Sequence, residues 1–199
     1  MIEKQNVIDF FDRCAPSWDA EMIRDDEIIS TILDNAGITA GKRVLDVACG
    51  TGVLIGDYLK RDVKSITGID ISPEMTARAK LKFTDSRVEF FCCDAEQFES
   101  DKKYDAIMIY NAFPHFPDPE KLFSHLTLLL AEGGTLTIAH GMSREKIDAH
   151  HHGAAQEVSV GLMEADRLAA LMEKYLTVSI KISDDRMYQV VGECRMYNA

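Results

Sequence analysis

Glycine and aspartate gather in one short run that has the composition of a ligand-binding turn. The run Asp46-Val47-Ala48-Cys49-Gly50-Thr51-Gly52 follows an apolar stretch that begins at Arg43. Gly50 and Gly52 permit tight turns and let a ligand come close to the backbone. The carboxylate of Asp46, ahead of the glycines, would repel a pyrophosphate and suits a ligand that carries an ammonium and a sulfonium. The run therefore predicts a nucleotide-type pocket at the carboxyl end of a strand.

The spacing of the glycines separates this run from a dinucleotide site. The dinucleotide fingerprint is GxGxxG, in which a pyrophosphate sits on the helix N-terminus. Here Gly50 and Gly52 are followed by Gly56, one residue later than the fingerprint requires. An NAD(P)-binding oxidoreductase with a similar sheet remains an alternative, and Asp46 is the residue that argues most strongly against it.

Two further aspartates stand where the next strands are expected to end. Asp70 ends the run that starts at Ser65, and a carboxylate there can accept hydrogen bonds from both hydroxyls of a ribose. Dehydrogenases use an acid in the same way, so Asp70 does not distinguish a dinucleotide from a ligand that carries an ammonium and a sulfonium. Asp94 follows the run 87–92 and either contacts a ligand or caps a short helix over 95–98.

Strands and helices alternate from residue 42 onwards, which is typical of βαβ units and a parallel sheet. We expect strands at 43–47, 65–70, 87–92, 104–109 and 135–139, and helices at 3–13, 24–35, 52–60, 73–82 and 119–130. Ser72 and Pro73 have the residue types of a helix cap and a first helical residue. Two strands around a tight turn, at 176–182 and 187–194, predict an antiparallel hairpin that closes the sheet edge.

The first strand, its loop and the acid after the second strand resemble the class I S-adenosylmethionine-dependent methyltransferases, of the type that acts on small molecules. The resemblance is strong over residues 40–140, and the run 46–52 matches the family's glycine motif DxxxGxG. It implies a Rossmann-like, doubly wound α/β fold with a mostly parallel seven-stranded sheet of order 3-2-1-4-5-7-6. It also implies S-adenosyl-L-methionine as the cofactor and S-adenosyl-L-homocysteine as the product.

The same resemblance assigns roles to individual residues. Asp70 is expected to bind the ribose, and Ile71 to line the adenine. Asp94 is expected to accept a hydrogen bond from the adenine amino group, and the backbone amide of Ala95 to meet the ring. The complete expected cofactor set is Trp18, Asp46, Ala48, Gly50, Gly52, Asp70, Ile71, Met75, Asp94, Ala95, Tyr110 and Asn111.

The N-terminal segment 11–19 is similar to the APxYD segment that folds over the cofactor as a lid in many small-molecule methyltransferases. Trp18 stands where that segment usually has tyrosine. Its indole N–H can still donate a hydrogen bond, although the phenol–carboxylate contact is lost. The alternative for Trp18 is simple core packing.

The acceptor pocket is expected beyond the fourth strand, at residues 110–116. DNA and protein-amide methyltransferases commonly read [N/D]PP[Y/F] there, whereas this chain reads NAFP from Asn111, which weakens the case for a nucleic-acid substrate. The segment instead resembles the LHHF run of small-molecule enzymes, with His115 at its second histidine. His115 is therefore a candidate base or substrate contact, with a structural histidine of the loop as the alternative. In-line methyl transfer needs a base only if the acceptor must lose a proton early.

A histidine-rich segment follows the fifth strand. His140 ends that strand at the rim expected to hold the cofactor, and Ser143 can cap a helix that reaches His152. The candidate catalytic residues are His115, His140 and His150. A metal site is a second hypothesis, with His140, His150 and His151 as its possible ligands. A solvated polar helix end is the third, because neighbouring helical side chains fan ~100° apart and cannot all reach one ion.

The composition limits the partners. The formal net charge is −11, which argues against capture of nucleic acid or attachment to an anionic membrane surface. No apolar run approaches the ~20 residues that span a bilayer, and we recognise no secretory signal. Five cysteines, an odd number without CxxC spacing, suit a reducing cytoplasm. The cysteines do not favour arsenic methylation. That reaction uses spaced thiols to hold the metalloid, whereas Cys92 and Cys93 are adjacent and Cys92 is expected in a buried strand.

We therefore predict one methyltransferase domain over residues 1–199 that acts on a small-molecule acceptor by in-line transfer. Its parts are an N-terminal helical lid (1–36), a cofactor-binding core (37–140), an acceptor-side insertion and helix (141–175) and a C-terminal hairpin (176–199). A protein that binds the cofactor without turnover is a further alternative. The acceptor atom and the oligomeric state, monomer or homodimer, stay open.

Overall fold

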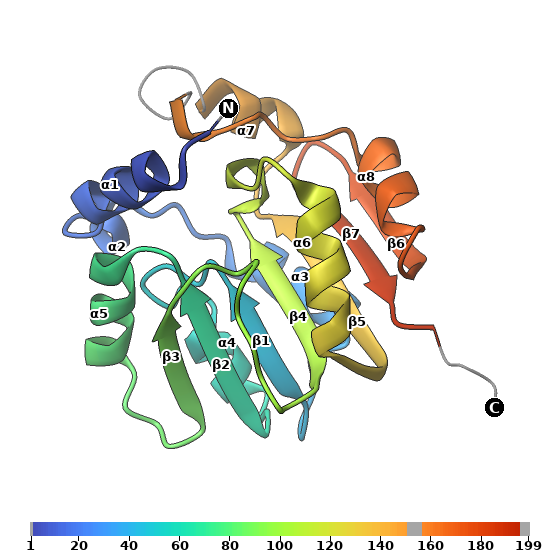
Figure 1. Ribbon diagram of the computed structural model, residues 1–199, viewed down its shortest axis with the longest axis horizontal. Coiled ribbons are helices and arrows are strands. Elements are labelled where there is room, and N and C mark those ends of the chain that lie inside the picture. The colour runs from blue at the N-terminus through green and yellow to red at the C-terminus, as the bar shows by residue number, and fades with distance from the viewer. Residues whose placement is uncertain (1, 151–156, 196–199) are drawn as a thin grey trace.

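The computed structural model describes residues 2–150 and 157–195, which form one seven-stranded sheet with helices on both faces (Figure 1). The strands are β1 (Arg43–Val47), β2 (Ser65–Asp70), β3 (Val88–Cys92), β4 (Tyr104–Tyr110), β5 (Leu130–His140), β6 (Thr177–Ser183) and β7 (Tyr188–Glu193). Their order is β3-β2-β1-β4-β5-β7-β6. Strands β1 to β5 pair in parallel, and β7 is antiparallel to both β5 and β6. The predicted fold class and strand order are thereby confirmed.

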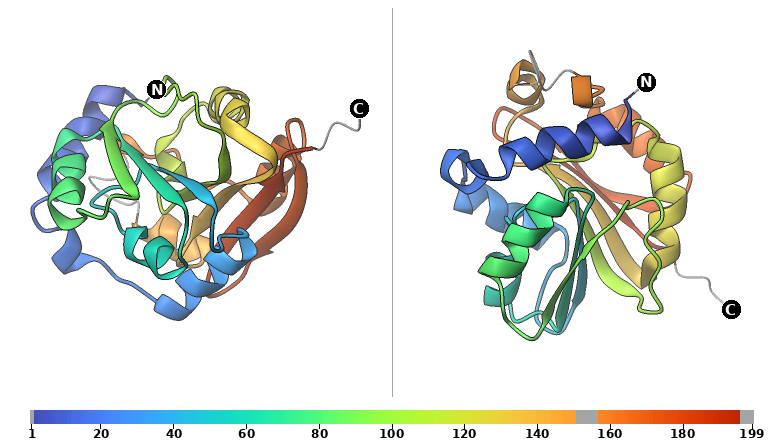
Figure 2. Two further views of the ribbon diagram at one scale, coloured as in Figure 1. Left: turned by 90° about the horizontal axis from the view of Figure 1, so that it is seen from below. Right: turned by 60° about the vertical axis from the view of Figure 1, so that its left-hand side comes forward.

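Helices cover the two faces of the sheet and its carboxyl edge. They are α1 (Lys4–Cys14), α2 (Trp18–Glu21), α3 (Asp26–Asn35), α4 (Ile55–Lys60), α5 (Pro73–Lys82), α6 (Pro119–Leu126), α7 (Arg144–His150) and α8 (Ala165–Met172), with 3₁₀ turns at 113–115 and 127–129. Helices α3, α4 and α5 share one apolar core, and α6 and α8 share the other. Figure 2 shows the helices around the sheet from two further sides. Helix α1 crosses above the carboxyl ends of the strands. Within residues 2–150 and 157–195, no helix has the length and apolar character that a membrane crossing needs.

Two-sided burial explains why the central strands read as continuous apolar runs. In β1, Leu45 and Val47 enter the core under α6 and α8, whereas Val44 enters the core under α3 and α4. The edge strand β6 instead alternates exposed and half-buried positions, because only one of its faces is covered. Position in the sheet therefore sets which strands are easiest to recognise from sequence.

The start of α5 follows the predicted cap. The hydroxyl of Ser72 accepts a hydrogen bond from the amide of Met75 at 3.1 Å, and Pro73 occupies the first helical position. This cap fixes the turn that directly follows Asp70. Helix α4 begins later than expected, at Ile55, because residues 51–54 form turns.

The predicted strand 135–139 is too short, and the neighbouring helix 119–130 is too long. Strand β5 begins at Leu130, and its glycine pair lies inside the strand, where its pairing with β4 shifts register. Gly133 has φ +68°, which permits this irregularity. Helix α6 accordingly ends at Leu126.

Two expectations around β3 are wrong. Residues 95–98 form a turn rather than a helix, in which an oxygen of Asp94 accepts a hydrogen bond from the Glu96 amide at 2.9 Å. Cys92 is exposed rather than buried, because β3 is the edge strand of the sheet.

Candidate functional site

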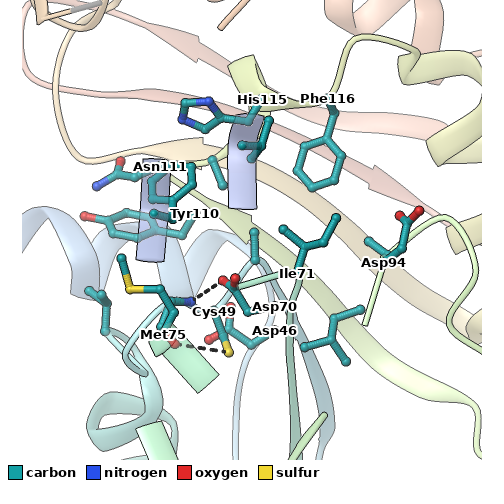
Figure 3. A pocket seen from close by; sticks show the side chains of 18 of the residues that line it. Asp46, Cys49, Asp70, Ile71, Met75, Asp94, Tyr110, Asn111, His115 and Phe116 are labelled. Carbon is teal, nitrogen blue, oxygen red and sulfur yellow. Dashed lines mark hydrogen bonds between the residues drawn. The ribbon is translucent and has the colours of Figure 1, made fainter. Parts of the chain in front are cut away.

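A cavity of about 340 Å³ lies at the carboxyl ends of β1, β2 and β4, beneath α1 (Figure 3). Its volume is within the range of small-molecule sites. All but one of the predicted cofactor residues line it, namely Trp18, Asp46, Ala48, Gly50, Asp70, Ile71, Met75, Asp94, Ala95, Tyr110 and Asn111. Gly52 is the exception.

The loop between β1 and α4 is built on left-handed backbone. Ala48, Gly50 and Gly52 have φ values of +54°, +56° and +86°. A Cβ atom on Gly52 would lie 2.7 Å from the ring of Phe83, so a side chain at this position meets both strain and overlap. Gly52 therefore shapes the loop from behind, whereas Gly50 faces the cavity.

Asp46 lies at the inner end of the cavity, next to Asp70 (Figure 3). Only 2% of Asp46 is exposed, and its Oδ2 has no hydrogen bond of ordinary geometry among the described residues, although the hydroxyl of Tyr58 lies close enough to favour its charged form. Burial, together with the negative charge of Asp70, raises the pKa of Asp46 to about 8. A buried carboxyl of this kind favours a cationic ligand, because the cation stabilises its charged form.

Asp70 ties the glycine loop to the start of α5. One of its oxygens accepts from the amide of Gly50 at 2.8 Å, and the other accepts from the amide of Ser72 at 2.8 Å. Burial raises the pKa of Asp70 to about 6, although these two hydrogen bonds oppose the shift. Each carboxylate oxygen has a further lone pair, so Asp70 can hold the loop and still accept from a diol.

Asp94 lies on the far rim of the cavity, where the N-terminal helix reaches it. The ammonium of Lys4 donates to Asp94 and, at 2.8 Å, to Glu96. Lys121 donates to the same oxygen of Glu96 at 2.8 Å. Sequence reasoning missed both Lys4 and Glu96, because no local pattern links side chains that lie about ninety positions apart.

Two further side chains hold the N-terminal segment above the cavity. Asp12 accepts a hydrogen bond from the hydroxyl of Ser72, ahead of α5. Asp19 accepts from the hydroxyl of Thr51, in the glycine loop, and from Lys82 at 2.8 Å. With the contacts of Lys4, the segment is fastened to three different strand ends, and 11–19 lies where a lid is expected.

Aromatic rings line the outer part of the cavity. The ring of Phe11 lies edge-on to Trp18, with centroids 5.7 Å apart, and edge-on to His115, with centroids 5.0 Å apart. Phe10 and Phe116 also line the cavity. Sequence reasoning included Trp18 and His115 but missed these phenylalanines, although the apolar face of the first helix was a usable signal.

The end of β4 carries a strained residue that points at the cavity. Asn111 has φ +54°, and its side-chain oxygen accepts from the amide of Gly141 at 3.0 Å. Such backbone in a residue other than glycine is concentrated at functional sites. Burial raises the pKa of the neighbouring Tyr110 to about 12, so its hydroxyl is neutral at neutral pH.

His115 lines the cavity on the side opposite Asp46 and Asp70 (Figure 3). Its Nδ1 lies 2.7 Å from the carbonyl oxygen of Val158. A carbonyl only accepts hydrogen bonds, so Nδ1 carries the proton, and in the neutral ring Nε2 is the acceptor nitrogen.

In the part of the chain that the structure describes, His115 is the only predicted catalytic histidine that lines this cavity. His140 is buried, with 2% exposed, and its ring lies edge-on to Tyr188 at 6.0 Å. The side chain of His150 and the whole of His151 lie outside the described residues. Among residues 2–150 and 157–195, no three His, Cys, Asp or Glu side chains are grouped to hold a metal ion.

Comparison with known sequences finds a family match in the central part of the chain. A family described as "Methyltransferase domain" matches residues 44–134. The malonyl-[acyl-carrier protein] O-methyltransferase of Acetivibrio thermocellus is 35% identical over 143 residues, which cover 70% of this chain and 50% of that protein. The chain thus spans half the length of this curated relative.

Comparison with solved structures finds the same fold over nearly the whole chain. The methyltransferase bound to the Trm112 activator of Haloferax volcanii has a TM-score of 0.81 at 19% identity, with 97% of this chain and 99% of that chain covered. The N-methyltransferase NodS of Bradyrhizobium japonicum, in complex with S-adenosyl-l-homocysteine, has a TM-score of 0.74 at 16% identity, with 96% and 100% covered.

Proposed function

We propose that the chain is a class I S-adenosylmethionine-dependent methyltransferase and that it transfers a methyl group to a small, neutral acceptor. The family match agrees with the predicted cofactor, S-adenosylmethionine. One observation carries the proposal for the site. The buried Asp46 and Asp70, the glycine loop and Asp94 converge on a single cavity beneath α1.

The residues of this cavity fit the proposed methyl donor. The buried carboxyl group of Asp46, which lines the cavity, suits the ammonium of the methionyl group. Asp70 suits the ribose hydroxyls, and Ile71, Met75 and Ala95 offer an apolar face for the adenine. When bound there, S-adenosylmethionine supplies an electrophilic methyl group on its sulfonium.

His115 is the residue to which we assign the acceptor's proton. In the proposed reaction the acceptor oxygen or nitrogen forms a bond to the methyl carbon while the carbon–sulfur bond breaks. The acceptor proton passes to Nε2 of His115, whose Nδ1 proton is held by the carbonyl of Val158. Among the predicted catalytic histidines His115 is preferred to His140, because His140 is absent from the cavity wall.

The charges in the cavity favour a neutral acceptor over an anionic one. Among the described residues that line it, Lys4 is the only lysine or arginine, and it is bound to Asp94 and Glu96. An acidic acyl group, as in the malonyl substrate for which the Acetivibrio thermocellus relative is named, would find no counter-charge here. A phenol or an uncharged amine fits the aromatic wall made by Phe10, Phe11 and Phe116.

The donor site is tested by thermal unfolding with S-adenosylhomocysteine or NAD. We expect S-adenosylhomocysteine to raise the Tm by several degrees at 100 times its Kd, which stabilises the fold by ~2.7 kcal/mol, and NAD to leave it unchanged. The reverse result would favour an oxidoreductase, for which Asp46 is poorly suited because a pyrophosphate would face its carboxyl group. Binding of S-adenosylhomocysteine without turnover of any acceptor would favour a protein that binds the cofactor without methyl transfer.

Turnover is tested with labelled S-adenosylmethionine and a panel of phenols, amines and carboxylic acids. We expect transfer to a neutral acceptor and a loss of roughly 10²-fold or more in kcat for His115→Gln. His125→Gln is the matched control, since Nε2 of His125 lies 2.8 Å from the carbonyl oxygen of Phe98, outside the cavity. Equal activity of the two variants would remove His115 from the reaction.

We also propose a cytoplasmic location and the division into lid, core, acceptor-side and hairpin segments given above. The location is supported by the cysteines, all five of which are free. The division is supported by the cavity, because residues of the lid (1–36) and of the core (37–140) face each other across it.

A further inference from the structure

A second cavity, of about 730 Å³, lies next to the first on the acceptor side. Its walls come from the loop after β4, from α7, from the segment 159–164 and from the start of α8. Phe116 and Pro117 line both cavities, so the two meet at this corner of the loop. The ring of Phe116 points into the first cavity from the side opposite Asp46 (Figure 3). A ligand that extends away from the donor site beyond Phe116 would therefore enter the second cavity.

The floor of the second cavity is apolar. Phe113 and Leu162 are buried with 3% exposed, and Met163 and Pro119 continue the apolar surface. Val160 is 60% exposed in the wall, one of the few large apolar side chains that face solvent in the described residues. Val160 therefore offers its side chain to a ligand that occupies this cavity.

Charged side chains in the wall hold the wall together. Arg144 donates to the carbonyl of Leu162 at 3.0 Å and pairs with Glu164. Asp148 accepts from the amide of Leu162 at 3.1 Å and lies 3.6 Å from Arg144. Arg144 thus carries one positive charge against two negative ones, and Arg167 supplies the second positive charge, so the charged side chains of the lining sum to zero. Among the charged side chains of the lining, Arg167 is the only one that forms no ion pair within the described ranges 2–150 and 157–195.

The wall of the second cavity is joined to the loop that carries His115. The amide of Val160 donates to the carbonyl of Pro114 at 2.9 Å, and Nδ1 of His115 donates to the carbonyl of Val158 at 2.7 Å. A group held in the second cavity is therefore placed at a fixed position relative to the imidazole of His115.

We propose that the acceptor is an extended molecule, with a neutral reactive head in the first cavity and an apolar tail in the second. The proposal rests on the proposed function and deepens it by naming the shape and polarity of the substrate. It commits the second cavity to an apolar chain, because Phe113, Leu162 and Met163 line it together and the charges of its wall sum to zero, which favours such a chain over a charged group.

The test measures how affinity depends on chain length. 4-Methylcatechol, 4-butylcatechol and 4-hexylcatechol are titrated into the protein saturated with S-adenosylhomocysteine, and Kd is measured by calorimetry. We expect Kd to fall roughly three- to fourfold for each added methylene group, the increment for burying a methylene in an apolar site. Val160→Trp fills the cavity, and Val160→Asp places a charge in its wall. Both variants should reduce the increment to less than twofold.

Leu128→Trp is the matched control, because Leu128 is 67% exposed and lines neither cavity. It should keep the full chain-length dependence. A Kd that is independent of chain length in the unmodified protein overturns the proposal, as does an unchanged increment in a folded Val160 variant. Failure of S-adenosylhomocysteine to bind contradicts the proposed function instead. The catechol series is then measured without S-adenosylhomocysteine, and the dependence of Kd on chain length supports or overturns the proposal for the second cavity in the same way.

Discussion

The buried Asp46 makes cofactor binding dependent on pH, and the dependence has a definite sign. The pKa of this carboxyl is about 8 in the folded protein, against ~3.9 for an aspartate in an unfolded chain. Its folded pKa is raised, so its contribution to stability is complete below about pH 4 and is lost as the pH rises through 8. Between these two values the free energy of unfolding falls with rising pH, by up to ~1.4 kcal/mol for each pH unit.

A bound ammonium reverses this effect, because it favours the charged form of Asp46. At pH 7 the empty site holds a proton on this carboxyl, and binding of the cationic ligand releases it. We therefore expect the Kd for S-adenosylhomocysteine to fall about tenfold between pH 6.5 and 7.5. Asp46→Asn removes the titrating group while keeping its shape, so its Kd should change less than twofold over the same interval.

Calorimetry in phosphate and in Tris buffer counts the released protons directly, since the two buffers have different ionisation enthalpies. We expect close to one proton per ligand for the unmodified protein at pH 7 and close to none for Asp46→Asn. Asp185→Asn, at an exposed position between β6 and β7, is the control and should behave as the unmodified protein. A Kd that is flat between pH 6.5 and 7.5, with no proton released, would refute the coupling of Asp46 to the ligand.

Three other perturbations test the loop, the lid and the reacting group. Gly52→Ala places a Cβ 2.7 Å from the ring of Phe83 at φ +86°, so we expect a loss on the order of 2 kcal/mol in urea-induced unfolding. Lys4→Met removes the contact with Asp94, and stopped-flow measurement should show S-adenosylhomocysteine leaving about two- to fivefold faster, since a half-exposed ion pair contributes ~1 kcal/mol or less. For His115→Gln, kcat should fall roughly 10²-fold or more while the Kd for S-adenosylhomocysteine changes less than twofold, and an unchanged kcat would assign the proton transfer to another group.

The sheet was predictable because its centre is buried on both faces. The bounds of β1 and β2 follow directly from apolar runs that end in Asp46-Val47 and Asp70, and the cap of α5 follows from Ser72. Strand β5 was harder, since its glycine pair resembles a turn but sits in a strand with shifted register. Local residue types cannot distinguish these two outcomes, because the pairing with β4 decides between them.

The donor side of the cavity was also predictable, whereas its closure was not. Asp46, Asp70 and Asp94 stand at strand ends, and parallel strands bring such ends to one edge. The contacts of Lys4 depend on how α1 lies across that edge, which no short-range pattern encodes. The second cavity depends on the same kind of long-range packing, between the loop after β4 and the segment 159–164.

The N-terminal segment is fastened to the core of the protein through Lys4, Asp12 and Asp19. Because these anchors sit on three different strand ends, the segment blocks the route above the donor site as long as all of them hold. The donor must therefore enter before the segment closes, and the spent donor leaves only after it opens. Phe116 and Pro117 also line the second cavity, so an acceptor that enters from there does not pass the segment. We expect opening of the segment to limit the exchange of the donor and of S-adenosylhomocysteine, whereas the acceptor can bind before or after the donor.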